Sequence, residues 1–352
     1  MAGFQSPPIR RILTVLSVLF VLSLSTAVSA FNVSTLRFDE AYTPLFGHHN
    51  GNLIRSSDDK SVRLVLDRYT GSGFASSDLY QHGLFSASIK LPSDYTAGVV
   101  VAFYTSNGDV FRDTHDELDF EFLGNVHGKP WRIQTNVYGN GSTSRGREER
   151  YLLWFDPTKE FHRYSILWTE THIIFYIDEV PIREVVRSDA MGGDYPSKPM
   201  AVYATLWDGS TWATSGGRYP VNYKYSPFVS EFSDLVLRGC RKDPIQQSPS
   251  AAAGDGCAAS DAELAEAEYA TITPERRQAM LKFRHKYMTY SYCYDARRYP
   301  VPFPECDVIP SERVRFRDTG NSNIVGIRHR RHVKRGRRVP AVGMGSNSQA
   351  AI

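Results

Sequence analysis

The chain has 352 residues, of which 12% are aromatic, and its formal net charge is +3. This length is enough for one large β-domain with an appendage. After the first thirty residues no stretch is apolar enough to cross a bilayer, which excludes a membrane-spanning protein.

Residues 1–30 have the pattern of a secretory signal. A basic start (Arg10, Arg11) precedes the mostly apolar stretch Ile12–Leu24, and small residues predict cleavage after Ala30. The alternative is a membrane anchor, which the shortness of the apolar run disfavours. We therefore expect a secreted protein that has no membrane association once the signal is removed.

Two N-glycosylation sequons become meaningful if the chain is secreted. They are Asn32-Val33-Ser34 and Asn140-Gly141-Ser142. Asn32 would lie at the new N-terminus, so Asn140 is the favoured acceptor of the two.

Between residues 38 and 238 the pattern is one of short strands and turns. Six segments alternate apolar and polar residues or form short β-branched and aromatic runs. These predicted strands are Gly83–Leu91, Gly98–Thr105, Arg132–Tyr138, His162–Trp168, Ile173–Ile177 and Met200–Trp207. Turn signals separate them, at 106–109 and at 178–181. Many short strands without a long helical period or a fixed repeat predict an all-β sandwich or jelly roll.

One segment, His115–Asn125 (HDELDFEFLGN), carries an unusual row of acids. On a β-strand Glu117, Asp119 and Glu121 share one face, and the apolar residues between them share the other. Like charges side by side on a strand are unfavourable, and no Lys or Arg alternates into this row. The alternative is a solvated acidic face, but a purely structural strand has little reason to hold three carboxylates there.

The spacing of the two glutamates limits the chemistry. On an extended strand the Cα atoms of Glu117 and Glu121 lie about 13 Å apart. Side chains that lean together could bring the carboxyl groups to the roughly 5–5.5 Å of retaining glycosidases, and their reach also allows the wider inverting spacing. We favour retaining double displacement.

The eleven-residue motif resembles the catalytic signature of plant xyloglucan endotransglucosylase/hydrolases, in glycoside hydrolase family 16. The resemblance implies that Glu117 is the nucleophile, Glu121 the proton donor and base, and Asp119 an assisting residue. It places His115 among the substrate-binding residues. It further implies a concanavalin-like β-jelly roll with this strand in a concave cleft, and neither a cofactor nor a metal is expected.

The next predicted strand carries two amides, Gln134 and Asn136, on one face. An exposed polar face is the alternative, but amide donors and acceptors suit sugar hydroxyls. The family resemblance implies that both side chains line the cleft.

A loop with two Trp residues begins at the end of the predicted strand Met200–Trp207. Trp is most often buried, but two Trp residues in a polar, Gly-containing loop are hard to bury together. The resemblance places Trp207 and Trp212 on the acceptor side of the cleft, where they would stack on sugar rings. Asp208 and Gly217 are the neighbouring candidates for substrate binding.

All four cysteines lie after residue 239. They are Cys240, Cys257, Cys293 and Cys306, and an even number in a secreted chain predicts disulfides. Three pairings are possible, while zinc binding is disfavoured because no paired C-x-x-C spacing is present. The family resemblance implies Cys240–Cys257 and Cys293–Cys306.

The C-terminal part predicts a linker, a helix and an extension. The Ser-, Ala-, Pro- and Gly-rich stretch Gln246–Gly256 should be mobile. Thr273 can cap a helix that begins at Pro274. Residues 287–306 resemble the C-terminal extension peculiar to xyloglucan-active plant members, which adds Tyr290 and Arg298 to the predicted substrate contacts.

The end of the chain is strongly basic. From Arg313 to Arg338 there are ten Lys or Arg residues and a single acid, Asp318. Such a segment is typical of a disordered tail. Nucleic-acid binding is disfavoured by secretion, which leaves two alternatives, a tail without a role and one that binds acidic wall polymers.

The expected organisation is a signal (1–30), a jelly-roll catalytic domain (31–238), a small disulfide-linked extension containing a helix (239–312) and the basic tail (313–352). We expect a secreted, monomeric enzyme of the cell wall and apoplast. It would cleave xyloglucan and transfer the glycosyl group to another xyloglucan chain, to an oligosaccharide or to water.

Two rival functions remain open. One is a lectin-like module on the same jelly roll, although a single alternating strand offers few oxygen ligands for calcium. The other is a glucanase of different substrate range. The resemblance of the C-terminal extension favours xyloglucan over mixed-linkage glucan or laminarin as the substrate.

Overall fold

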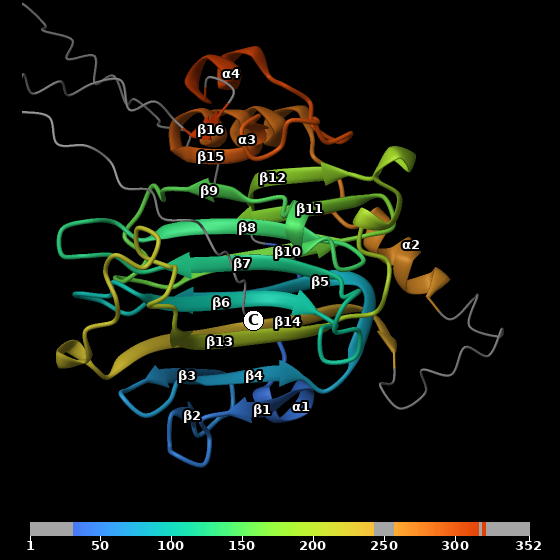
Figure 1. The fold of residues 1–352 in the computed structure, drawn as a ribbon. Coiled ribbons are helices and arrows are strands. Elements are labelled where there is room, and N and C mark those ends of the chain that lie inside the picture. The colour runs from blue at the N-terminus through green and yellow to red at the C-terminus, as the bar shows by residue number, and fades with distance from the viewer. Residues whose placement is uncertain (1–30, 243–256, 317–318, 322–352) are drawn as a thin grey trace, which may run out of the picture.

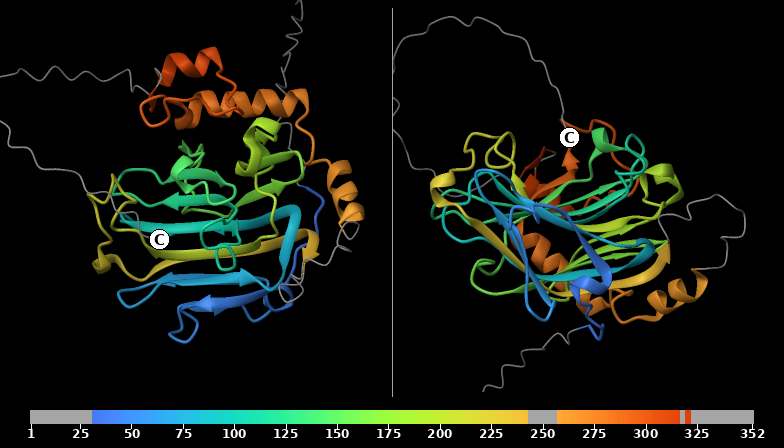
Figure 2. Two further views of the ribbon diagram at one scale, coloured as in Figure 1. Left: turned by 45° about the vertical axis from the view of Figure 1, so that its right-hand side comes forward. Right: turned by 90° about the horizontal axis from the view of Figure 1, so that it is seen from below.

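The computed structural model describes residues 31–242, 257–316 and 319–321. The predicted signal, the linker 246–256 and most of the basic tail lie outside these ranges. The described residues form two antiparallel sheets that pack face to face as a jelly-roll sandwich (Figures 1 and 2).

The larger sheet has nine strands within the described residues. Across the sheet they are β1 (Tyr42–Phe46), β4 (Ser72–Ser76), β13 (Ala201–Asp208), β6 (Val99–Ser106), β7 (Glu117–Leu123), β8 (Arg132–Tyr138), β9 (Glu149–Tyr151), β15 (Met288–Asp295) and β16 (Thr319–Asn321). The acidic segment is β7, at the centre of this sheet.

The second sheet has seven strands within the same ranges. They are β12 (Val180–Val186), β11 (His172–Ile177), β10 (His162–Trp168), β5 (Leu79–Lys90), β14 (Phe228–Lys242), β3 (Ser61–Leu66) and β2 (Leu53–Arg55). All six predicted strands are therefore confirmed, as is the all-β sandwich.

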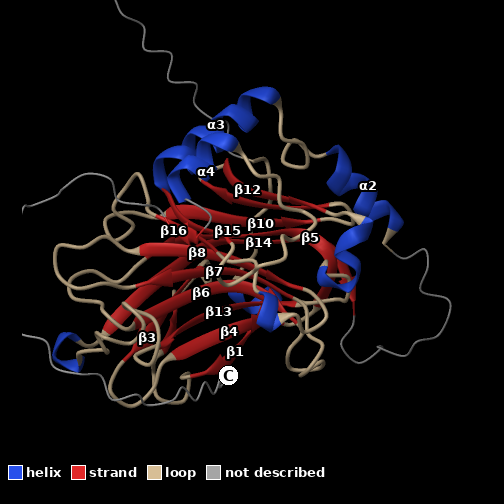
Figure 3. Ribbon diagram, turned by 45° about the horizontal axis from the view of Figure 1, so that its top comes forward, coloured by secondary structure: helices blue, strands red, loops and turns tan. Residues whose placement is uncertain are grey.

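Helices are few and lie mainly at one end of the sandwich (Figure 3). They are α1 (Phe38–Ala41), α2 (Ala258–Glu266), α3 (Pro274–Tyr287) and α4 (Pro310–Phe316), with 3₁₀ turns at Thr143–Arg145, Asp189–Asp194 and Tyr223–Tyr225. The predicted cap of α3 is confirmed, because Thr273 accepts a hydrogen bond from the backbone N–H of Arg276 and Pro274 is the first helical residue.

The core between the sheets explains why β7 is held rigidly. Its apolar residues Leu118, Phe120 and Phe122 are fully buried. The ring of Phe122 packs edge-on against Tyr164 of β10 at 4.7 Å, and Phe120 packs edge-on against Phe175 of β11 at 5.2 Å. Because successive residues alternate, this packing turns the acidic row to the opposite, outer face.

The C-terminal extension joins the sandwich more closely than the sequence predicts. β14 continues to Lys242, past the expected domain boundary at 238, and β15 pairs with β9 at the edge of the nine-stranded sheet. The extension therefore widens the sheet that carries β7. Both predicted disulfides are confirmed, with Cα–Cα distances of 5.3 Å for Cys240–Cys257 and 5.5 Å for Cys293–Cys306.

The expected start of a disordered tail at Arg313 is wrong. Residues up to Phe316 belong to α4, and Phe316 is fully buried against Tyr294, with ring centroids 5.1 Å apart. Arg315 donates to the backbone carbonyls of Arg284 at 2.9 Å and Met288 at 2.8 Å. A basic composition predicts disorder only where no packing compensates for the chain entropy that is lost on ordering. Here the packing of Phe316 against Tyr294 provides that compensation.

No helix in the described ranges has the length and apolar character needed to cross a bilayer.

Candidate active site

Three carboxylates meet in one cleft on the outer face of β7. Glu117, Asp119 and Glu121 all line a cavity of about 480 Å³, together with Phe46, Ala102, Tyr104, Tyr138, Thr205 and Trp207. The row predicted from the period-2 pattern is thus confirmed as a common face. It opens to a cavity large enough for sugar rings.

The neighbouring strands place polar groups beside each acid. In the sheet register Asp119 lies between Tyr104 of β6 and Asn136 of β8, and Glu121 lies opposite Gln134. Gln134 Nε2 donates a hydrogen bond to Glu121 Oε2. The two amides predicted to line the cleft therefore do flank the acids.

His115 stands just before β7, beside the first carboxylate. Its Nε2 lies 3.9 Å from Glu117 Oε2, and the two side chains are 17% and 24% exposed. In the next strand Asn136 Nδ2 donates to Tyr138 Oη at 2.5 Å. These contacts hold the polar groups around Glu117 and Asp119 in fixed positions.

The cleft raises the pKa of all three acids, but to different extents. Burial raises the pKa of Glu121 to about 7, although the hydrogen bond from Gln134 opposes the rise, and the charges of Glu117 and Glu148 add to it. Burial and the charges of Glu117 and Glu121 raise the pKa of Asp119 well above its usual range.

Glu117 has the most groups that favour its charged form. Burial raises its pKa, while a hydrogen bond with Ser106, the nearby His115 and a hydrogen bond with Asp119 all lower it. The arrangement can therefore keep a proton on Glu121 and on Asp119 while Glu117 is ionised, which separates the roles of two chemically alike side chains.

A fourth carboxylate, Asp116, is buried at the start of β7 and serves the scaffold. It accepts hydrogen bonds from the backbone N–H of Asn140 at 2.7 Å, from those of Ser197 and Lys198 at 2.8 Å, and from Lys198 Nζ at 2.7 Å. These bonds tie two loops to the end of β7. Its odd-numbered neighbours face the cleft, whereas Asp116 faces the protein.

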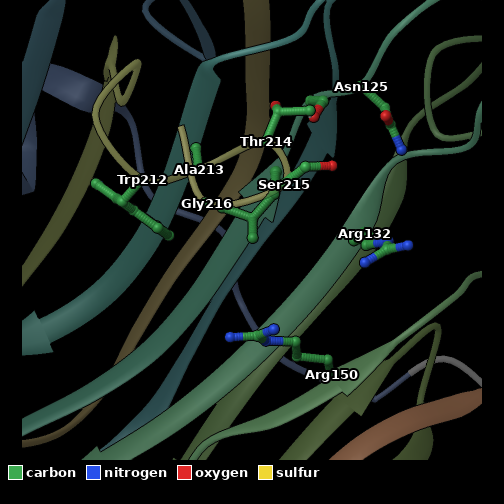
Figure 4. A pocket seen from close by; sticks show the side chains of 10 residues that line it. Asn125, Arg132, Arg150, Trp212, Ala213, Thr214, Ser215 and Gly216 are labelled. Atoms are coloured by element: carbon green, nitrogen blue, oxygen red, sulfur yellow. The ribbon is translucent and has the colours of Figure 1, made fainter. Parts of the chain in front are cut away.

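A second pocket of about 210 Å³ adjoins the cleft near Glu121's end of β7. Figure 4 shows Trp212 on its loop on one side and Arg132 and Arg150, from β8 and β9, on the other. Trp207 and Trp212 lie with ring centroids 5.9 Å apart, so the structure brings both predicted aromatic residues to the cleft.

Arg150 connects this pocket to the C-terminal extension. Its guanidinium lies 5.1 Å from the ring centroid of Tyr290, and it also contacts the carboxylate of Glu148. Arg298 Nη1 lies 3.5 Å from Glu148 Oε2. Tyr290 and Arg298 thus reach the cleft edge through Arg150 and Glu148.

Two predicted substrate residues have contacts that shape their loop. Asp208 accepts hydrogen bonds from the backbone N–H of Ser210 at 2.8 Å and from Tyr223 Oη at 2.5 Å, so it stabilises the loop. Gly217 has φ of +80°, and a Cβ there would lie 2.4 Å from the carbonyl oxygen of Thr211. Neither is among the residues that line the two pockets, and their binding of substrate stays a prediction.

Several cleft residues were missed from the sequence. Tyr138 could have been found, since it continues the row of Gln134 and Asn136 two residues further along the same strand. Thr205 could have been found in the same way, since it lies two residues before Trp207 on a predicted strand. Phe46 and Arg150 carry no such signal, because they reach the cleft from strands distant in sequence. Within the described part of the chain no group of three or more His, Cys, Asp or Glu side chains is arranged to hold a metal ion.

Comparison with known proteins places this site in a family. The profile for Glycosyl hydrolases family 16 matches residues 39–225, and that for Xyloglucan endo-transglycosylase (XET) C-terminus matches residues 259–306. The probable xyloglucan endotransglucosylase/hydrolase protein 30 of Arabidopsis thaliana is 61% identical over 322 residues, which cover 91% of this chain and 92% of the relative. The chain belongs to the xyloglucan endotransglucosylase/hydrolase family.

A second relative agrees with this family assignment. The probable xyloglucan endotransglucosylase/hydrolase protein 29 of Arabidopsis thaliana is 56% identical over 334 residues, covering 93% of each chain. Among solved structures, the Bacillus licheniformis β-glucanase is 22% identical, covers 59% of this chain and 95% of its own, and has a TM-score of 0.45. The resemblance inferred from the sequence is confirmed, and this family member carries the predicted acidic row in its cleft.

Proposed function

We propose that this family member cleaves the β-1,4-glucan backbone of xyloglucan by a retaining double displacement and transfers the glycosyl group to another xyloglucan chain or to water. The observation that carries the proposal is the division of charge along β7. Glu117 and Glu121 line one cleft in unequal surroundings. Burial raises the pKa of Glu121 to about 7, whereas Ser106, His115 and Asp119 oppose the rise in the pKa of Glu117. This difference favours a proton on Glu121 beside an ionised Glu117, which is the pairing that the reaction needs.

In the first step Glu117 is the nucleophile. Its carboxylate attacks the anomeric carbon while Glu121 gives its proton to the departing glycosidic oxygen, so a covalent glycosyl ester forms and the reducing-end fragment leaves. Asp119, protonated because of burial and its two acidic neighbours, assists by hydrogen bonding to Glu117. Gln134 keeps the Glu121 carboxyl oriented.

In the second step Glu121, now ionised, acts as the base. It takes a proton from the incoming hydroxyl, whose oxygen attacks the anomeric carbon and releases Glu117. A sugar hydroxyl gives transfer, and water gives hydrolysis. The same residue serves as acid and then as base because its pKa of about 7 lets it exchange a proton readily.

Substrate binding is assigned to the walls of the cleft. Gln134 Oε1 and His115 Nδ1 are buried and lack a hydrogen-bond partner among the described residues, which supports their use by sugar hydroxyls. Trp207 and Trp212 offer stacking surfaces. On the acceptor side, Tyr290 and Arg298 complete the set with Arg150.

We place the mature enzyme outside the cell, in the wall. Asn140 and Asn32 are both exposed, which supports glycosylation of either sequon.

The basic tail would hold the enzyme on acidic wall polymers. Truncation after Asn321, which keeps α4 and β16, should leave transfer on soluble xyloglucan unchanged and reduce retention on de-esterified pectin at low salt. Equal retention of both forms at low salt would make the tail a passive extension.

The function is tested with purified enzyme, xyloglucan and a labelled xyloglucan oligosaccharide. Label in polymer measures transfer, and new reducing ends measure hydrolysis. Barley mixed-linkage glucan in place of xyloglucan tests the glucanase alternative. A chelator added to a sugar-binding assay tests the lectin alternative, because binding without turnover that disappears with chelator would overturn the proposal.

A further inference from the structure

A second groove lies outside the catalytic cleft, where three loops meet. They follow β5, β7 and β9 and comprise residues 91–98, 124–131 and 152–161. Together they enclose about 600 Å³, compared with about 480 Å³ beside the acids. The beginning of the middle loop, Gly124 and Asn125, lines the pocket next to the cleft, so this loop separates the two spaces.

An incompletely covered indole lies in this groove. Trp154 remains 39% exposed although its ring packs edge-on against Phe155 at 4.9 Å and Phe283 at 5.4 Å. A second indole, Trp131, is buried in the wall, and its Nε1 donates to the carbonyl oxygen of Pro92 at 3.2 Å. A rigidly held ring with an open part is the kind of surface on which sugar rings stack.

Two lysines line the groove together with the exposed indole. They are Lys129 and Lys159. A third, Lys286, has its ammonium 4.9 Å from the ring centroid of Tyr287, which lies 6.3 Å from that of Trp154, but it does not line the groove. None of the three forms an ion pair with a carboxylate of the described residues.

The acids of the groove already have partners of their own. Asp94 lies 3.3 Å from His127 Nε2, and Asp156 accepts hydrogen bonds from the backbone and hydroxyl of Thr158 at 3.1 and 2.8 Å. Asp94 and Asp156 keep their negative charges, but neither lies within ion-pair distance of Lys129 or Lys159. Both ammonium groups therefore stand without a carboxylate partner among the described residues, in the same groove as the aromatic surface. A neutral glucan would use the ring and leave the ammonium groups without partners.

We propose that this groove binds a segment of an acidic polysaccharide, with a sugar ring on Trp154 and uronate carboxylates on Lys129 and Lys159. The site is separate from the catalytic cleft, and none of its residues belongs to the basic tail. It would hold the enzyme on an acidic polymer while the cleft stays free for xyloglucan. A charge-assisted contact to each lysine explains a preference for acidic over neutral sugars.

The test uses the full-length chain and a linear hexamer of α-linked galacturonic acid, with its carboxyl-reduced form as the neutral probe. Titration calorimetry at low salt compares the wild type, Lys129→Gln/Lys159→Gln, and the control Lys60→Gln/Arg68→Gln. The control removes two exposed positive charges next to β3, in the other sheet. All three proteins keep the same tail, so a tail contribution cancels.

We expect the groove variant to bind the acidic hexamer about tenfold or more weakly than the wild type, and the control to change by less than about twofold. Transfer activity on soluble xyloglucan should be the same in all three. Two results would overturn the proposal: equal affinities of the groove variant and the control, or equal binding of the acidic and carboxyl-reduced hexamers by the wild type.

Discussion

Glu121 on β7 and Glu149 on β9 are both largely enclosed carboxylates in the same sheet, two strands apart. Glu149 is held by two hydrogen bonds from Arg284, at 2.7 and 2.8 Å, and lies 3.6 Å from Arg183. Burial alone would raise its pKa, but the charges of these arginines outweigh burial and lower it to about 2.

Glu121 has the opposite fate, because burial raises its pKa to about 7 and the hydrogen bond from Gln134 only partly opposes that rise. The comparison shows what separates a structural carboxylate from a catalytic one in this fold. Where a guanidinium pairs directly with the acid, the pair joins β9 to α3. Where burial acts on acids that lie beside one another without such a pair, their pKa values rise and they keep protons that a reaction can use.

The largest expected effect comes from removing the proposed nucleophile. Glu117→Ala should lower both transfer and hydrolysis by about a thousandfold or more, because no neighbouring carboxylate stands in its place. The fold should persist, since the change relieves repulsion within the row. Glu231→Ala is the control, because it removes a half-buried acid of the other sheet that pairs with Arg63 and Lys90. Activity of a folded Glu117→Ala protein within tenfold of wild type would sink the assignment.

The second prediction tests the structural role of Glu149 by removing its partner Arg284. Arg284→Met leaves Glu312 buried without its cation and leaves Glu149 with Arg183 alone, which should cost about 3–5 kcal/mol of unfolding free energy. Urea unfolding measures this. Arg277→Met, on the same helix but paired at the surface with Glu184, should cost about 1 kcal/mol or less. Similar costs for the two variants would show that the buried cluster has no special weight.

The raised pKa of Glu121 predicts a pH-dependent stability. Its ordinary value is 4.5 and its folded value about 7, so its stabilising contribution is complete below pH 4.5 and is lost as the pH rises through 7. Glu121→Gln cannot ionise. Its melting temperature should therefore match wild type at pH 4 and exceed it by several degrees at pH 8. Thermal unfolding of both proteins at the two pH values measures this. A difference in melting temperature between the variant and wild type that does not change with pH would contradict the raised pKa.

The smallest effect is expected at the rim of the cleft, where a sugar ring would stack on an aromatic side chain and no charged group is removed. Trp212→Ala should weaken use of the acceptor more than attack on the donor, because Trp212 lines the pocket beside Arg132 and Arg150. Stacking of a ring on an aromatic side chain is worth about 1–3 kcal/mol, by analogy with nucleobases. Separate KM values for donor and acceptor measure this. Equal losses for both substrates would place Trp212 in a structural role.

The sequence predicts local features of this molecule well. The acidic row follows from strand periodicity, the start of α3 from Thr273 and Pro274, and the disulfides from the family pattern. Each depends on residues close together in the chain or on a specific motif.

Features that depend on distant residues were not predictable in the same way. The pairing of β15 with β9 brings Tyr290 to Arg150 across 140 residues, and no periodicity encodes that register. Arg315 and Phe316 look like the start of a disordered basic tail, yet a pocket formed by α3 and β15 orders them. Asp208 and Gly217 were predicted to bind substrate because the loop that contains them was. Their contacts within the loop, which help to shape it, could not be predicted.

The most direct test of the central claim is to locate the covalent intermediate. Wild-type enzyme is mixed with xyloglucan in the absence of added acceptor, quenched in acid within one turnover and digested, and its peptides are weighed by mass spectrometry. The account predicts a glycosyl ester on the peptide that contains β7, at Glu117, and none in Glu117→Ala. An ester on Glu121 or Asp119, or turnover with inversion and no ester, would contradict it.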